Sequence, residues 1–187
     1  MHEIEPTYNW RKYYISENDR KSPFYGRSYG QAYEDTIYGY YIDPNWDSIG
    51  SETLYCKILM VDYSAKYAVI ELFGEWNDTL HNDSMYFKRT VVDHLLKYGI
   101  KYYILIGENI LQFHGGETDY YEEWFEDIED GWIAAVSIRD FIMVEFRRYH
   151  LDSYINFGGT LQISNWRTLK PNPFFELISN LIMRRLG

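Results

Sequence analysis

Cysteine is almost absent from this sequence: Cys56 is the one thiol in 187 residues, which excludes an intramolecular disulfide. Cys56 lies in an apolar run with no histidine beside it, so we interpret it as a small buried hydrophobe and not as a nucleophile. Long apolar runs are missing too, which argues against a membrane-spanning helix. His2, Glu3 and Glu5 follow Met1 where a secretory signal would be basic and then apolar. We therefore expect a cytoplasmic protein.

Basic residues are also few. The chain has 18 Lys and Arg residues against 28 Asp and Glu residues, a net charge of −10. Eight of these acids and no base fall between Glu117 and Asp130. A chain without a basic stripe cannot neutralise many phosphates, so neither nucleic acid nor an anionic membrane is an expected partner.

Leucine and valine are missing from the first fifty residues, which instead carry nine tyrosines together with Trp10 and Trp46. Disordered tails are usually poor in aromatic residues. We therefore predict that residues 1–53 form an irregular aromatic arm. This arm should pack on a single α/β domain of residues 54–187, or on a second copy of it. A domain of this length buries enough surface to fold without a disulfide or a metal.

Alternating strands and helices are predicted from residue 54 onward. Residues 54–62 and 67–73 are β-rich runs separated by a four-residue turn, which indicates a hairpin. Helical spacing follows over 82–98, with Asp78 and Asn82 as candidate caps. The apolar run 102–106 is typical of a strand covered on both faces.

The second half of the chain continues this alternation. A helix is predicted over 119–130, a strand over 132–138 and a helix that Asp140 caps. A strand over 153–157 and a terminal helix beginning at Asn172 complete the order. The fold class is therefore α/β. We expect a mostly parallel sheet with an antiparallel edge hairpin, helices packed on the sheet and an aromatic N-terminal extension.

The order from Leu54 to about Phe157, β-β-α-β-α-β-α, resembles the STAS domain of anti-sigma-factor antagonists and SpoIIAA-like proteins. That family carries an Asp-Ser-Ser/Thr-Gly type signature after a central strand, where a kinase phosphorylates the serine. The matching stretch here, from Ile106 to Thr118, has no serine, and Thr118 is its one hydroxyl. The resemblance thus implies a fold and a regulatory, protein-binding role, but it assigns no functional residue.

Polar residues follow the predicted strands, and in an open α/β sheet ligands gather at the carboxyl ends of the strands. We take Glu75, Glu108 and His114 as candidate catalytic residues, either as an acid–base group or as metal ligands. The residues predicted to line a binding site beside them are Trp76, Asp78, Asn109, Phe113 and Arg139. The alternative is structural: Asp78 and Asp140 as helix caps, and Glu108 paired with Arg139.

Four further acids, Glu122, Glu123, Glu126 and Asp127, lie off the apolar stripe of the predicted helix 119–130. Such a run is usually a solvated face. The alternatives are a docking surface for a basic partner or a weak cation site.

Catalytic and cofactor motifs are absent: the sequence contains no G-x-G-x-x-G, G-x-S-x-G, H-E-x-x-H or C-x-x-C. We therefore predict a non-enzymatic protein-interaction or regulatory module with no cofactor and no metal. Its partner should be a protein, with a second copy of the chain, as a homodimer, among the candidates. The alternative function is a small-molecule- or metal-binding enzyme that uses the carboxylate and histidine cluster.

Overall fold

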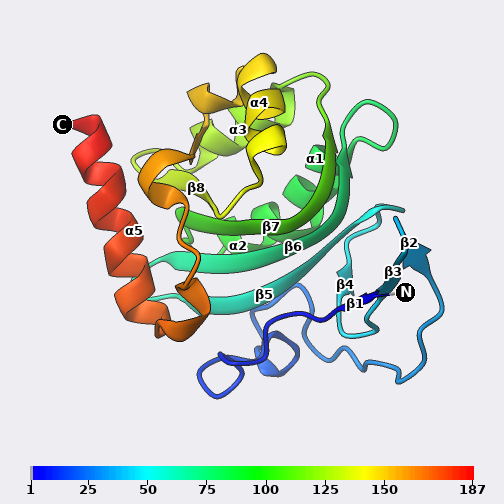
Figure 1. The fold of residues 1–187 in the computed structure, drawn as a ribbon. Helices are drawn as coiled ribbons and strands as arrows, with labels where there is room; N and C mark the ends of the chain where they lie inside the picture. Colours follow the sequence, from blue (N-terminus) through cyan, green and yellow to red (C-terminus); the bar gives the residue numbers. More distant parts are fainter. Residues whose placement is uncertain (1) are drawn as a thin grey trace.

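A computed structural model describes residues 2–187, and a six-stranded sheet forms its centre (Figure 1). The strand order across this sheet is β4-β5-β6-β7-β8-β9. The strands are β4 (Asp47–Ser48), β5 (Leu54–Asp62), β6 (Tyr67–Asn77), β7 (Tyr102–His114), β8 (Trp132–Val136) and β9 (Ile155–Phe157). Strands β6 to β9 are parallel, whereas β4 and β5 are antiparallel to their neighbours. The predicted α/β fold with a mostly parallel sheet and an antiparallel edge hairpin is confirmed.

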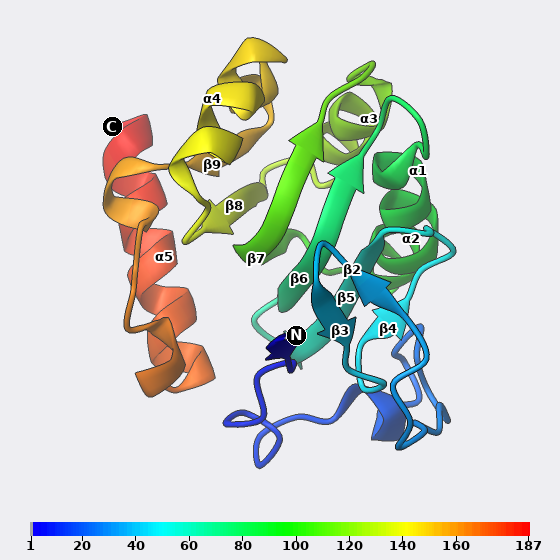
Figure 2. The ribbon, with the colours of Figure 1, turned by 45° about the vertical axis from the view of Figure 1, so that its right-hand side comes forward.

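Helices connect the successive parallel strands, and a last helix follows β9. They are α1 (Asp83–Phe87), a π-helical turn (Lys88–Val92), α2 (Asp93–Leu96), α3 (Asp119–Asp127), α4 (Asp140–Arg148) and α5 (Pro171–Leu186). Alternating strand residues such as Ile70 and Leu105 pack with α1, α2, α3 and α4 in one core. The other set, including Val69 and Ile104, packs with α5 in a second core. The sheet is thus covered on both faces, and Figure 2 shows α5 on the side opposite α1, α2 and α3.

The N-terminal segment contacts both cores, with Trp10 in the α5 core and Phe24 in the core on the opposite side, and it contains a small sheet of its own. This sheet has the order β1-β3-β2, from β1 (His2–Ile4), β2 (Thr36–Ile37) and β3 (Tyr40–Ile42). Trp10, Phe24 and Trp46 are buried. Trp46 stacks on Phe73 of β6 with ring centroids 5.2 Å apart, and its indole N–H donates to the Ile4 carbonyl at 2.8 Å. The division into an arm and a domain at residue 54 stays a prediction.

Two predicted elements differ from the structure, and one glycine does not form the turn that its residue type suggests. The predicted helix 82–98 is interrupted by the π-helical turn, which rotates Lys88 into the protein. The predicted strand 102–106 continues as β7 to His114, across two irregularities in its pairing with β6. Gly107, which resembles a turn signal, is required by packing, since a Cβ there would lie 2.7 Å from Ile138 Cγ1.

The helix caps were also predicted wrongly in two places. The terminal helix begins at Pro171 and not after Asn172, whose side chain instead accepts a hydrogen bond from the Tyr67 hydroxyl. Arg139 occupies the cap position before α4, and Asp140 is the first helical residue. No helix within residues 2–187 combines the length and the apolar character that a membrane crossing requires.

Candidate functional site

A hollow lies beyond the carboxyl ends of β6 and β7. These ends are adjacent because Asn77 pairs with His114 in the parallel register. The Asp78 N–H donates to the His114 carbonyl at 2.8 Å and closes this end of the sheet. The hollow beyond has a volume of about 700 Å³ and is bordered by Leu80, Arg89, Glu117, Asp119 and Tyr120, among others. We call it the strand-end groove.

The charge of the strand-end groove is negative. Arg89 on its wall is neutralised by two hydrogen bonds to Glu123, at 2.6 and 2.8 Å, and by one to Asp93 at 2.8 Å. Glu117 and Asp119 are exposed and form no ion pair within residues 2–187. The groove therefore presents free carboxylates to an incoming ligand.

Asp78 is the structural centre of this end of the sheet. Its carboxylate accepts hydrogen bonds from the Ser84 N–H at 2.7 Å, from the Trp76 indole at 3.2 Å and from the Tyr121 hydroxyl. Burial raises the pKa of Asp78, although these donors oppose the shift. It therefore joins β6 to α1 and α3.

Lys88 organises half of the predicted acidic surface. It is 1% exposed and donates to Asp93, to Glu123 at 3.3 Å and to Asp127 at 2.7 Å. Oxygens of these three carboxylates lie within 4.8 Å of one another, a spacing that suits a cation, but the Lys88 ammonium already lies among them. Glu122 and Glu126 remain exposed on the outer face of α3.

Glu75 and His114 are the two catalytic candidates that the structure brings together. Glu75 Oε1 lies 3.6 Å from His114 Nε2, and it also accepts a hydrogen bond from Asn77 at 2.6 Å. The Tyr38 hydroxyl, on the turn between β2 and β3, donates to the other oxygen. Burial pushes the pKa of Glu75 upward, but the hydrogen bonds from Tyr38 and Asn77 and the charge of His114 outweigh it, so the pKa is lowered. Glu75 is thus held ionised.

Glu108, the third candidate, lies elsewhere because β7 continues past it. In the pairing of β7 with β6, Ile106 lies opposite Glu71 and Asn109 lies opposite Phe73, so Glu108 falls between these two pairs. Glu75 lies farther along the strand, opposite Gln112. The Glu108 carboxylate pairs with Arg167 and accepts the Trp166 indole N–H at 3.3 Å.

The remaining predicted binding residues are dispersed. The Arg139 guanidinium donates to the Glu108 main-chain carbonyl at 2.9 Å, so the expected Glu108–Arg139 side-chain pair is not formed. Trp76 and Phe113 are core side chains that pack together with ring centroids 6.1 Å apart. Asn109 donates to Glu71 at 3.4 Å. The structure therefore gathers Asp78 alone of this set on the wall of the strand-end groove.

Glu71 is the most unusual polar residue that sequence reasoning missed. It is fully buried in the middle of β6, where it accepts the Thr7 N–H at 2.7 Å and lies 3.5 Å from Arg167. Burial raises its pKa to about 7, against the opposing effects of the Thr7 hydrogen bond and the Arg167 charge. The available signal was one acid inside the apolar run Tyr67–Phe73. Glu71 fastens the N-terminal arm to the sheet.

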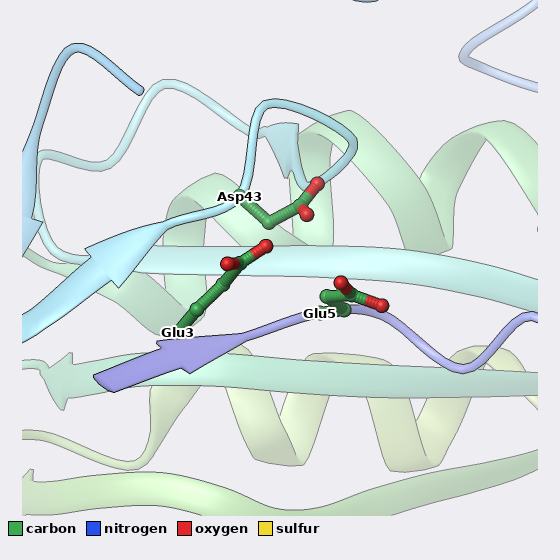
Figure 3. Close-up of side chains that lie close together, drawn as sticks. All are labelled: Glu3, Glu5 and Asp43. Atoms are coloured by element: carbon green, nitrogen blue, oxygen red, sulfur yellow. The ribbon is translucent and has the colours of Figure 1, made fainter. Parts of the chain in front are cut away.

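A second acidic group lies on the arm (Figure 3). Glu3, Glu5 and Asp43 place carboxylate oxygens within 4.8 Å of one another. Glu5 is exposed, and slight local desolvation, followed by the charges of Glu3 and Asp43, raises its pKa. One Asp43 oxygen is already engaged by the N–H and the side-chain amide of Asn45, at 2.7 and 2.9 Å. The group therefore forms an acidic edge of the arm.

Comparisons with known proteins assign no family. No protein-family model matches the chain, and no curated protein is similar to it in sequence. Among solved structures, the phosphorylated form of the Bacillus cell fate determinant SpoIIAA is similar, with 13% identity and a TM-score of 0.40. The similarity covers 56% of this chain and 92% of that protein. It is a weak resemblance at the level of the fold.

Proposed function

We propose that this chain is a non-enzymatic protein-interaction module whose partner docks in the strand-end groove. The observation that carries the proposal is the groove itself, about 700 Å³ of open space at the carboxyl ends of two parallel strands. Ligand sites in open α/β sheets concentrate at this position. The free carboxylates of Glu117 and Asp119 favour a partner segment that carries basic side chains.

An apolar contact is available on the same wall. Leu80 is 78% exposed at the border of the groove, and Tyr120 of α3 also borders it. A partner that covers Leu80 removes its apolar surface from water, while charge complementarity orients the approach. The expected partner is therefore a protein segment with basic residues around an apolar anchor. A second copy of the chain is one candidate source of that segment.

The geometry supports an enzymatic role less well. A general base acting near neutral pH needs a pKa near 7, whereas the pKa of Glu75 is lowered by its hydrogen-bond donors. Glu108 is engaged by Arg167 and Trp166, away from His114. The net charge of −10 opposes binding to nucleic acid, and the single buried thiol suits a cytoplasmic location.

The proposal is tested by titrating isotope-labelled protein with synthetic Lys- and Arg-rich peptides that each carry one leucine. Backbone amide shifts should concentrate at Leu80, Gly116, Tyr120 and their neighbours, and binding should weaken with salt. Shifts spread evenly over the acidic surface, or centred on Glu75 and His114, would count against the groove as the docking surface.

A further inference from the structure

A second groove lies on the N-terminal arm, about the start of β5. It consists of two hollows of about 280 and 360 Å³. Asp35, Ile42 and Tyr55 border both hollows, so the two are adjacent lobes of one groove. We call it the arm groove.

Among the described residues, those that border the arm groove include acids and no bases. Glu34, Asp35 and Asp43 border the first lobe, and Asp35 and Glu52 border the second. None of these four carboxylates forms an ion pair within the part of the chain that the structure describes. Both lobes are therefore complementary to positive charge.

The floor of the arm groove is apolar and fixed in place. Trp46 borders the first lobe and is held by its stack on Phe73 and its hydrogen bond to Ile4. Ile37 borders the second lobe and approaches the backbone of β6, since a Cβ on Gly74 would lie 3.6 Å from Ile37 Cδ1. Because both anchors reach the large sheet, the groove is formed before any ligand arrives.

We propose that the arm groove binds an extended polypeptide segment of a partner with Lys or Arg side chains at positions i and i+2. In an extended segment these two side chains point the same way, about 7 Å apart, so that two adjacent lobes can take one each. Their aliphatic stems pack on Ile42 and Tyr55, while their charged ends reach the wall carboxylates. The Tyr55 ring, shared by both lobes, adds a cation–π contact.

A metal ion fits the arm groove less well than a basic segment. Three carboxylates near the groove do approach one another, those of Glu3, Glu5 and Asp43, and an Asp43 oxygen is occupied by Asn45. The wall acids Glu34, Asp35 and Glu52 are not among them. An extended basic segment satisfies carboxylates that are distributed along a groove, whereas a single ion requires them to converge.

The experiment compares two fluorescent peptides of equal charge, one with arginines at i and i+2 and one with arginines at i and i+1. The wild-type protein should bind the first peptide more tightly. The Glu34→Gln/Glu52→Gln variant should bind it about three- to thirtyfold more weakly, from the loss of two exposed ion pairs. Both side chains are exposed, and neither accepts a hydrogen bond from any of residues 2–187, so the variant should fold normally.

The control variant is Glu117→Gln/Asp119→Gln, which alters the strand-end groove and should leave this affinity unchanged. Equal affinity for the two peptides, or equal weakening by both variants, would overturn the arm groove as the site. Saturable binding of Ca²⁺ that Glu34→Gln/Glu52→Gln abolishes, without peptide binding, would also overturn the proposal in favour of a metal site. Because the two grooves share no residue, failure here leaves the function proposed for the strand-end groove intact.

Discussion

Replacing Glu71 by glutamine should stabilise this protein at and above neutral pH. Glu71 is fully buried in the sheet, and burial raises its pKa from 4.5 to about 7. A folded carboxyl with a raised pKa binds more protons than the unfolded one between these two values. The free energy of unfolding is therefore unaffected by Glu71 ionisation below pH 4.5. It falls as the pH rises toward 7 and stays at the lower value above that pH.

The magnitude follows from the size of the shift. Each pKa unit corresponds to about 1.4 kcal/mol, so ionising Glu71 in the folded state costs about 3 kcal/mol. Glutamine cannot ionise, and its carbonyl oxygen can still accept the Thr7 N–H. Glutamine pairs more weakly with Arg167 and Asn109, which should reduce the stabilisation by about 1 kcal/mol. We expect Glu71→Gln to be about 2 kcal/mol more stable than the wild type at pH 8, and equal to it or slightly less stable near pH 4.5.

The assay is chemical denaturation of both proteins from pH 4.5 to 8.5. The difference between the two curves isolates Glu71 from the other carboxylates, several of which have lowered pKa values and act in the opposite direction. Glu176→Gln, an exposed substitution on α5, serves as the control and should give a flat difference. A Glu71→Gln protein that is less stable than the wild type at pH 8 would refute the reasoning, because it would mean that the ionised carboxylate is stabilising.

Three further predictions concern the arm, the acidic surface and the charge. Trp10→Ala removes a side chain that is 2% exposed and packs on Trp166 and Phe174. It should lower the free energy of unfolding by about 3–5 kcal/mol and speed proteolysis before Leu54, whereas Tyr13→Ala, at an exposed position, should do neither. Lys88→Met leaves three carboxylates close together and should lower the free energy of unfolding by about 1–3 kcal/mol at neutral pH. This loss should shrink as the pH falls toward 4, and a loss that does not depend on pH would point to packing instead. Fluorescence anisotropy should detect no binding to single- or double-stranded DNA at physiological salt, and micromolar binding with a steep salt slope would contradict the charge argument.

The fold was predictable because the spacing of the apolar residues along the chain indicates which segments are strands and which are helices. Ile104, Leu105 and Ile106 indicate a strand covered on both faces, and the structure covers both with helices. The end of β7 was not predictable, since Gly107 and Glu108 look like a turn but are accommodated by a pairing irregularity inside the strand. Because β7 continues past Glu108, this residue lies beside Arg167 and not at the predicted strand end.

Other site features depend on contacts between distant residues. Glu71 is matched by Thr7 and Arg167, which are 64 and 96 positions away in the chain, so no local pattern could reveal its role. The acidic run on α3 was visible, but its division into paired and free members depends on Lys88 and Arg89 of the preceding helical segment. Composition thus located the acidic character of the surface, and the fold determined which carboxylates remain free.

The most direct test of the proposed function compares two charge-reversal variants on the same helix region. Glu117→Lys/Asp119→Lys changes the free acids of the strand-end groove, and Glu122→Lys/Glu126→Lys changes two exposed acids outside its wall. Both variants alter the net charge equally, so non-specific attraction to a basic peptide falls equally in both. The measured quantity is the ratio of their dissociation constants for the leucine-containing basic peptide. We predict that the groove variant binds at least tenfold more weakly than the outer variant, a difference of about 1.4 kcal/mol or more. A ratio near one would contradict the assignment of the strand-end groove as the docking surface.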